Sequence, residues 1–320
     1  MSLLKRCRVA LEPWLLRLAF ACVGRFPRAV VRGMAAFLGL VGYWVSPLLR
    51  RMGRANLELA FGAERTATER ERILRRSFQS FALVVLDAFW FARNTRERLR
   101  RWVRFERPLA EVLGGGAHLC LTGHLGNWEL LGQATAQEGF PLASVATPLK
   151  NPAVDRVFNR HRQTLGQLII PRQGAVRALL RVLRDGGNVA LLLDQNTRLS
   201  DGGVFTDFFG RPVTVSAAAA LLSARAQAGF VFGFCLPDER GGYLVRMPPV
   251  LPPAPRDAGE AVLAEWTSRI TQVYEDEVRR RPECWLWTYK RWRFIRPGDD
   301  PARYPFYATP IERLPAEAEL

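Results

Sequence analysis

The residues best suited to chemistry stand in one segment, Thr122-Gly123-His124-Leu125-Gly126-Asn127-Trp128-Glu129. In a continuous helix, the spacing of His124 and Glu129 would place their side chains about 140° apart. A bend between them is therefore needed before a carboxylate can meet the imidazole. Gly123 and Gly126 permit such a bend, and Asn127 is a good N-cap, which places Glu129 in the first turn of a helix.

With that bend, Glu129 can accept a hydrogen bond from one nitrogen of His124 and leave the other nitrogen as a general base. No Ser or Cys nucleophile stands beside the pair, so the expected target is a substrate hydroxyl. Backbone N–H groups between Gly123 and Asn127 are candidates for stabilising an oxyanion. Alternatively, His124 is an ordinary loop histidine and Glu129 only complements the helix dipole. Spacing alone leaves both interpretations open.

A second polar group, Asp194-Gln195-Asn196, follows a strongly apolar run. A carboxylate in that position must leave the core or find a partner. Asp194 can therefore anchor a site from a neighbouring strand, or it can simply cap a turn. Arg162, in Arg162-x-x-x-Gly166, can hold a phosphate or be one of many exposed arginines.

The elements that must position these residues alternate between helix and buried strand. We predict strands at 118–122, 188–193, 230–235 and 243–247. We predict helices at 127–137, 175–184 and 216–228, and a long helix from Thr66, which has capping-box spacing to Glu69. This pattern indicates an α/β fold, a mostly parallel mixed sheet flanked by helices on both faces. Reactive groups gather outside the carboxyl ends of such strands.

Two apolar stretches, 9–24 and 33–49, lie among basic residues at the amino terminus. Seventeen residues of helix reach roughly 26 Å, short of the roughly 30 Å hydrocarbon core. Two full spans would also leave a basic turn on the far side of the membrane, against the positive-inside tendency. We therefore expect residues 1–60 to form a membrane-associated helical hairpin lying in the cytoplasmic leaflet, with one true span or two core helices as alternatives. We expect a catalytic domain at 61–298, a loop at 248–255 and a loose tail at 299–320.

Composition excludes several classes of protein. The 320 residues are 48% apolar with nine Trp, which is not typical of a disordered chain, a collagen-like repeat or a disulfide scaffold. Five scattered Cys and three His offer no close metal-ligand spacing, so we expect a reducing compartment and no metal. A net charge of +16 favours anionic partners.

At these residues the sequence resembles a known family. Gly-His-Leu-Gly-Asn-Trp-Glu is similar to the His-x-x-x-x-Glu motif of the glycerolipid acyltransferase superfamily, in the form found in bacterial lipid A secondary acyltransferases. Further motifs occur in the family's order across residues 15–297: Arg54-Ala55-Asn56-Leu57, Pro148-Leu149-Lys150-Asn151-Pro152, Arg162-x-x-x-Gly166, Asp194-Gln195, Phe208-Phe209-Gly210-Arg211-Pro212, and Pro282-x-x-Trp285-x-Trp287 with Arg291-Trp292.

The resemblance implies transfer of a fatty acyl chain from acyl carrier protein to a hydroxyl of a phosphorylated lipid A precursor. The reaction would take place at the cytoplasmic face of the inner membrane, with acyl carrier protein as co-substrate and no cofactor. By position, His124 is then the general base and Glu129 its partner. Gly126, Asn127, Arg162, Asp194 and Gln195 are expected to shape the active site or bind substrate.

Two other functions stay open from the sequence. One is an acyltransferase for another glycolipid or for a lysophospholipid. The other is a basic membrane- or nucleic-acid-binding protein without catalysis, which the net charge would allow. The second explains neither the polar motifs at strand ends nor the long apolar segments, and no zinc finger or RNA-recognition signature is visible, so we expect no nucleic-acid partner.

Overall fold

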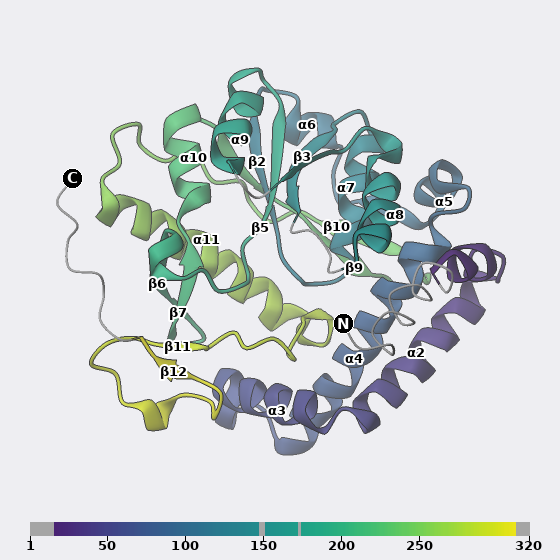
Figure 1. Ribbon diagram of the computed structural model, residues 1–320, viewed down its shortest axis with the longest axis horizontal. Helices are drawn as coiled ribbons and strands as arrows, with labels where there is room; N and C mark the ends of the chain where they lie inside the picture. Colours follow the sequence, from purple (N-terminus) through teal and green to yellow (C-terminus); the bar gives the residue numbers. More distant parts are fainter. Residues whose placement is uncertain (1–15, 147–150, 172–173, 312–320) are drawn as a thin grey trace.

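A five-stranded parallel sheet forms the centre of the computed structural model, which describes residues 16–146, 151–171 and 174–311 (Figure 1). Its strands are β2 (His118–Thr122), β3 (Leu142–Ala146), β4 (Leu168–Pro171), β5 (Asn188–Leu192) and β8 (Gly229–Phe232). They lie in the order β4-β3-β5-β2-β8, and every neighbouring pair is parallel. Because β2 and β5 are neighbours, the residues that follow them meet at one edge of the sheet.

Smaller sheets make the fold mixed. The strands are β1 (Val103–Phe105), β9 (Phe234–Pro237) and β10 (Tyr243–Arg246), the hairpin β6 (Gly203–Phe208) and β7 (Arg211–Ser216), and the short pair β11 (Phe294–Ile295) and β12 (Thr309–Pro310). β10 pairs with β1 in parallel and with β9 in antiparallel fashion. The strand predicted at 230–235 divides at Gly233 between β8 and β9, so it joins both sheets.

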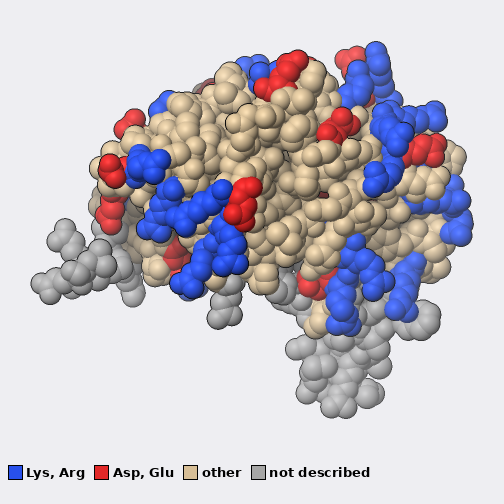
Figure 2. Space-filling model, turned by 90° about the horizontal axis from the view of Figure 1, so that it is seen from above, with Lys and Arg blue, Asp and Glu red and all other residues tan. Residues whose placement is uncertain are grey.

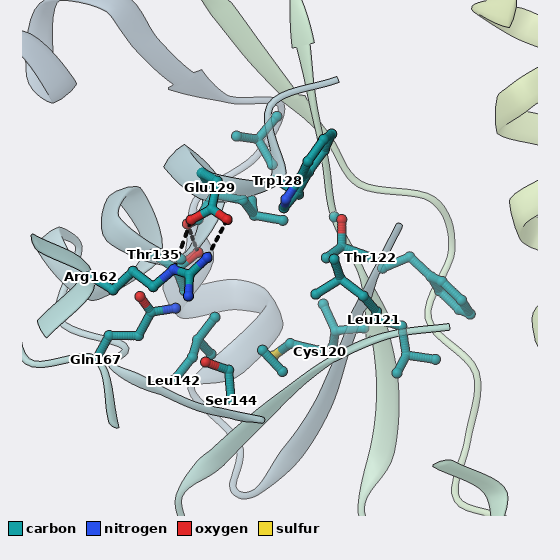
Figure 3. Close-up of a pocket in the computed structure, with 18 of the residues that line it drawn as sticks. Cys120, Leu121, Thr122, Trp128, Glu129, Thr135, Leu142, Ser144, Arg162 and Gln167 are labelled. Carbon is teal, nitrogen blue, oxygen red and sulfur yellow. Dashed lines mark hydrogen bonds and ion pairs between the residues drawn. The ribbon is translucent and has the colours of Figure 1, made fainter. Parts of the chain in front are cut away.

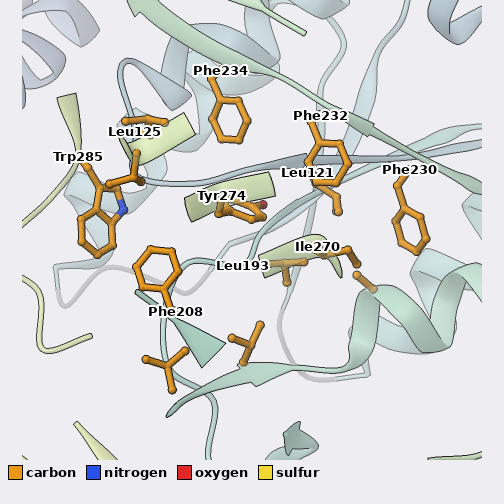
Figure 4. Close-up of a cluster of buried hydrophobic side chains, with 14 of the residues drawn as sticks. Leu121, Leu125, Leu193, Phe208, Phe230, Phe232, Phe234, Ile270, Tyr274 and Trp285 are labelled. Atoms are coloured by element: carbon orange, nitrogen blue, oxygen red, sulfur yellow. The ribbon is translucent and has the colours of Figure 1, made fainter. Parts of the chain in front are cut away.

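Helices cover both faces of the central sheet, as predicted. On one side lie α7 (Trp128–Gln137) and α8 (Pro152–Arg162), and on the other α9 (Ala175–Arg184), α10 (Ala218–Ala226) and α11 (Glu260–Arg280) (Figure 1). Strand side chains alternate between the two faces. Leu121 and Phe232 belong to the apolar cluster that contains Ile270 and Tyr274 of α11 (Figure 4), whereas Val231 belongs to the cluster that contains Leu130 of α7.

The remaining helices are α2 (Arg28–Val45), α3 (Pro47–Phe61), α4 (Ala67–Trp90), α5 (Thr95–Trp102) and α6 (Leu109–Leu113), with short 3-10 turns at Gly62–Glu64, Gln163–Leu165, Leu199–Asp201, Pro282–Cys284 and Pro301–Arg303. The predicted capping box starts α4, where Thr66 and Glu69 bond reciprocally. α2 packs along α4, and a Cβ on Gly39 would lie 2.4 Å from the Cα of Gln79. Only glycine allows the two helices to approach so closely.

The amino-terminal apolar stretches differ in part from the prediction. The stretch 33–49 is not one helix, because α2 ends at Val45 and Pro47 begins α3. By length and composition, the 18-residue α2, with a mean hydropathy of 1.2, could cross a membrane, and 28% of it is buried within the protein. Residues 16–23 are helical, while the rest of the first stretch, up to residue 15, lies outside the described residues.

The carboxyl-terminal segment is more ordered than the predicted loose tail. Within 299–311, β12 pairs with β11, and Tyr304 and Tyr307 are buried. The Tyr307 hydroxyl bonds to Asn56 of α3, which also donates hydrogen bonds to the carbonyls of Trp287 and Tyr289. The prolines of this segment therefore lie in packed turns and not in unstructured chain. Residues 312–320 lie outside the described part.

Candidate functional site

His124 stands just beyond the carboxyl end of β2 and is held by one carboxylate. Its Nδ1 lies 2.9 Å from Oδ1 of Asp194, and its backbone N–H donates to Oδ2 at 2.8 Å. The indole N–H of Trp285 also donates to Oδ2, at 2.9 Å. Because the carboxylate accepts, the proton of neutral His124 sits on Nδ1 and Nε2 is left as the basic nitrogen. The side-chain amide of Gln195 lies 3.4 Å from Nε2, where a substrate hydroxyl can replace it.

The two groups shift each other's pKa. Burial alone would lower the pKa of His124, but the charge of Asp194 and its hydrogen bond outweigh burial and raise that pKa above its ordinary value. Burial would raise the pKa of Asp194, yet His124 and the hydrogen bonds from Trp285 and the backbone lower it. Asp194 therefore stays ionised and acts as the acid that orients the imidazole.

The structure corrects the predicted role of Glu129. The carboxylate of Glu129 forms a bidentate pair with Arg162, with Nε to Oε2 at 2.9 Å and Nη2 to Oε1 at 2.5 Å (Figure 3). Within the described residues, no hydrogen bond joins Glu129 to His124. Glu129 does lie in the first turn of α7 as predicted, and its charge contributes to the raised pKa of His124. Asp194 takes the place on the imidazole because β5 lies directly beside β2.

The bend between β2 and α7 depends on two glycines. A Cβ on Gly123 would lie 2.9 Å from both Asp194 Cγ and Tyr274 Cε1. Gly126 has a φ of +70°, and its Cβ would lie 2.2 Å from the carbonyl oxygen of Cys235. Asn127 caps α7 as predicted, since its side chain accepts from the Leu130 N–H at 3.2 Å. The predicted turn is confirmed, and its geometry requires glycine at both places.

The backbone of this turn is already bonded. His124 N–H binds Asp194, Gly126 N–H binds the carbonyl of Cys284 at 3.0 Å, and Asn127 N–H binds the carbonyl of Cys235 at 2.7 Å. These three N–H groups were candidates for an oxyanion hole, and the structure rules them out because each has an acceptor within the protein.

A buried polar group beneath Asn127 was not predicted. The carboxylate of Asp87 on α4 is fully buried and pairs with Arg28 of α2. It also accepts a hydrogen bond from the Tyr243 hydroxyl and one from Nδ2 of Asn127 at 3.3 Å. The sequence does contain a signal for this buried group, because Asp87 is an acid within the apolar run Leu83–Trp90. Asp194 is a similar case, an acid that follows the apolar strand β5. This group ties α2 and α4 to the start of α7.

A cavity of about 240 Å³ opens beside His124, between α7 and the sheet. Cys120, Ala190 and Ser144 lie in one row across β2, β5 and β3, and Thr122 pairs with Leu192 in the next row. All five residues line the cavity. Burial raises the pKa of Cys120 to about 12, so its thiol stays protonated and is a poor nucleophile.

The two ends of the cavity differ in chemistry. Toward β8 and β10 the walls are apolar, formed by Phe105, Leu109, Leu113, Val231, Val245 and Met247. Toward β3 and β4 they include Ser144, Gln167 and the Glu129–Arg162 pair (Figure 3). His124 therefore faces a space that can hold an alkyl chain on one side and polar groups on the other.

Comparisons with known proteins find similarity along nearly the whole chain. Residues 3–294 match the family described as bacterial lipid A biosynthesis acyltransferase. The chain is 26% identical over 280 residues to the lipid A biosynthesis palmitoleoyltransferase of Escherichia coli (strain K12), covering 84% of this chain and 87% of that protein. It is 26% identical over 297 residues to the phosphatidylinositol mannoside acyltransferase of Mycolicibacterium smegmatis, covering 89% and 94%.

One solved structure is also similar in part. The crystal structure of the 1-acyl-sn-glycerophosphate (LPA) acyltransferase PlsC from Thermotoga maritima aligns with a TM-score of 0.34 at 14% identity, covering 78% of this chain and 99% of that one.

Proposed function

The chain belongs to the bacterial lipid A biosynthesis acyltransferases, a family of enzymes that acylate lipids, and on that premise we propose that it transfers a fatty acyl chain from an acyl-carrier-protein thioester to a hydroxyl of a phosphorylated lipid A precursor. The observation that carries the proposal is the geometry of His124. Its Nδ1 is held by Asp194, and it lines a cavity with an apolar end.

The chemistry follows from those residues. Nε2 of His124 takes the proton of the acceptor hydroxyl as the oxygen attacks the thioester carbonyl, and Asp194 stabilises the imidazolium that forms. The acyl tail lies in the apolar end, where removal from water contributes about 0.8 kcal/mol for each CH₂ group. No covalent acyl-enzyme is needed.

The charge distribution supports anionic substrates. Figure 2 shows Lys and Arg side chains gathered toward both ends of the face seen from above, with a broad uncharged area between them. The net charge of +16 favours encounter with an acidic carrier protein and with phosphate groups on the acceptor. Arg162 is less free to bind phosphate than predicted, because Glu129 already occupies it.

We further propose that the protein works at the cytoplasmic face of the inner membrane. Large apolar side chains are exposed along α2 and the start of α3, among them Phe37 at 65%, Trp44 at 59% and Leu48 at 60%. An exposed apolar face of this size is unusual for a protein surrounded by water and suits insertion into the lipid interface.

A second acceptor has a specific observation in its favour. The relative from Mycolicibacterium smegmatis is a phosphatidylinositol mannoside acyltransferase. Its alignment with this chain covers 94% of that protein and has the same 26% identity as the alignment with the Escherichia coli enzyme. Another phosphorylated glycolipid is therefore the alternative acceptor, with the same use of His124.

The test is an assay of the purified, full-length protein with acyl-carrier-protein and coenzyme A thioesters, each offered with a lipid A precursor, a phosphatidylinositol mannoside or a lysophospholipid. We expect product with the carrier-protein thioester and the lipid A precursor. His124→Ala should lower kcat by about 10²–10⁴-fold with acceptor binding retained. Retention of more than about a tenth of kcat by this variant would contradict the base assignment.

A further inference from the structure

Thr122, the last residue of β2, carries a hydroxyl that the mechanism above does not use. The residue is 5% exposed, and its Oγ1 is buried with no hydrogen-bond partner within the described part of the chain. An unpaired buried hydroxyl is destabilising and is therefore uncommon. Thr122 lines the cavity together with His124, and Figure 3 shows its oxygen turned toward Trp128 at the start of α7.

Thr122 and His124 are two residues apart and line the same cavity. The acceptor oxygen would lie about 3 Å from Nε2, and the attacked carbonyl carbon about 3 Å further. The carbonyl oxygen therefore falls near His124, in the cavity that Thr122 also lines.

Several other donors around this point are occupied. The N–H groups of His124, Gly126 and Asn127 have acceptors within the protein, and Arg162 is bound on two nitrogens by Glu129. Gln195 faces the basic nitrogen of His124, which is the position of the attacking hydroxyl. Thr122 Oγ1, in contrast, lies in the cavity wall without a hydrogen-bond partner among the described residues.

The backbone holds this hydroxyl in place. The Thr122 carbonyl accepts hydrogen bonds from the Tyr274 hydroxyl and from the Leu193 N–H, at 3.3 Å for the latter. The next residue, Gly123, fits between Asp194 and Tyr274 without room for a Cβ. A donor fixed in advance needs no reorganisation as charge develops, which is the condition for effective oxyanion stabilisation.

We propose that Thr122 is a catalytic residue that donates a hydrogen bond to the oxyanion of the tetrahedral intermediate, an inference that rests on the proposed acyl transfer. The acceptor oxygen forms a bond to the thioester carbon, its proton passes to His124 Nε2, and the carbonyl π electrons move to the oxygen bound by Thr122. The C=O bond then re-forms, the C–S bond breaks, and the leaving thiolate takes the proton from His124. The products are an ester and a free thiol.

The experiment compares Thr122→Val, which keeps the shape and removes the hydroxyl, with Thr122→Ser, which keeps the hydroxyl. We expect Thr122→Val to lower kcat about 10²–10³-fold with KM changed less than about threefold. Thr122→Ser should stay within about fivefold of wild-type kcat. The melting temperature of Thr122→Val should equal or exceed that of the wild type, because it removes an unpaired hydroxyl.

Two results would overturn the assignment. One is a Thr122→Val enzyme that keeps more than about a third of wild-type kcat, which would leave the first N–H groups of α7 to bind the oxyanion. The other is an equal loss of kcat in both variants. Failure of the proposed function is seen separately, as a wild-type protein without transfer activity or a His124→Ala variant as active as the wild type.

Discussion

One carboxylate, that of Asp194, holds both the ring and the backbone N–H of His124. Asp194 accepts from Nδ1 and from the His124 N–H, and Trp285 fixes the second carboxylate oxygen. The ring can therefore neither rotate nor exchange tautomers without breaking a buried hydrogen bond. Glu129 acts at longer range, since its charge is largely balanced by Arg162.

This arrangement predicts a pH profile. His124 must be neutral to act as a base, so kcat/KM should fall as the pH drops through its pKa, which lies above the usual 6.5. In Asp194→Asn the carboxylate is lost and burial dominates, so the acid limb should move to lower pH. The amide N–H would also donate to Nδ1 and force the proton onto Nε2, lowering kcat by at least about 10²-fold.

Glu129→Gln is the matched control for that experiment, because it removes a carboxylate that touches Arg162 and not the imidazole. We expect its acid limb to move less than that of Asp194→Asn. A larger shift in Glu129→Gln would mean that Glu129, and not Asp194, orients the base.

The candidate site could be predicted from the sequence only as far as local geometry reaches. The turn at Gly123 and Gly126 and the cap at Asn127 follow from neighbouring residues. The partner of His124 depends on which strand lies beside β2, and spacing along the chain does not reveal strand order. The sequence therefore identifies Asp194 only as a carboxylate in need of a partner, and it predicts Glu129 as the partner of His124.

Gly233 offers a test of the apolar end of the cavity. It lines the cavity, and a Cβ there would meet only side chains, the nearest being Leu131 Cδ2 at 3.4 Å. Gly233→Val should therefore fold and shorten the space for the acyl tail. With thioesters of increasing chain length, kcat/KM for the longest accepted chain should fall at least about tenfold relative to the shortest.

Gly259→Val is the control, because a Cβ at Gly259 has open space around it. This variant should leave the chain-length preference unchanged. Equal chain-length preferences in both variants would place the acyl tail elsewhere.

At the scale of elements, prediction succeeded where the pattern is strong and local. The helix Ala175–Arg184 and the strand His118–Thr122 have the bounds that periodicity predicts. β3 was missed because it is short and mixes small and polar residues with apolar ones, and β4 because it has only four residues and ends in a proline. The hairpin β6–β7 turns at Phe209 and Gly210, both with positive φ, and a Phe in that conformation carries no turn signal in the sequence.

The contact between α2 and α4 depends on the buried pair Arg28–Asp87. Replacing either partner alone leaves an unpaired buried charge, so Arg28→Met and Asp87→Leu should each lower the free energy of unfolding by about 3–5 kcal/mol. The double variant removes both charges and should be more stable than the sum of the single effects implies. Urea unfolding of the four proteins measures this coupling.

The exposed pair Arg54–Glu71 is the control for that cycle, because its side chains are 56% and 22% exposed. Exposed pairs typically couple by less than about 1 kcal/mol. A coupling at Arg28–Asp87 no larger than the one at Arg54–Glu71 would show that the buried pair does not hold α2 against α4.

Across the whole molecule, aromatic rings connect exposed apolar residues of α4 to the candidate site. The exposed ring of Phe81 on α4 lies 6.5 Å from that of Trp128, and Trp128 lies 4.7 Å from the ring of His124. Phe81 and Val85 of α4 add to the exposed apolar residues that α2 contributes. If α2 lies in the lipid interface, an acyl chain can move from the membrane toward the cavity without crossing water.

This arrangement predicts how the full-length protein binds vesicles. Phe37→Glu with Trp44→Glu places two charges on the exposed face of α2, so sedimentation with anionic phospholipid vesicles should recover at least about tenfold less protein than wild type. The melting temperature should change little, because both side chains are mostly exposed. Val250→Glu, at a residue that is 51% exposed in the 248–255 loop, should bind as the wild type does. Wild-type binding by the α2 variant would show that another part of the chain meets the membrane, and the path from lipid to His124 would then need a different entrance.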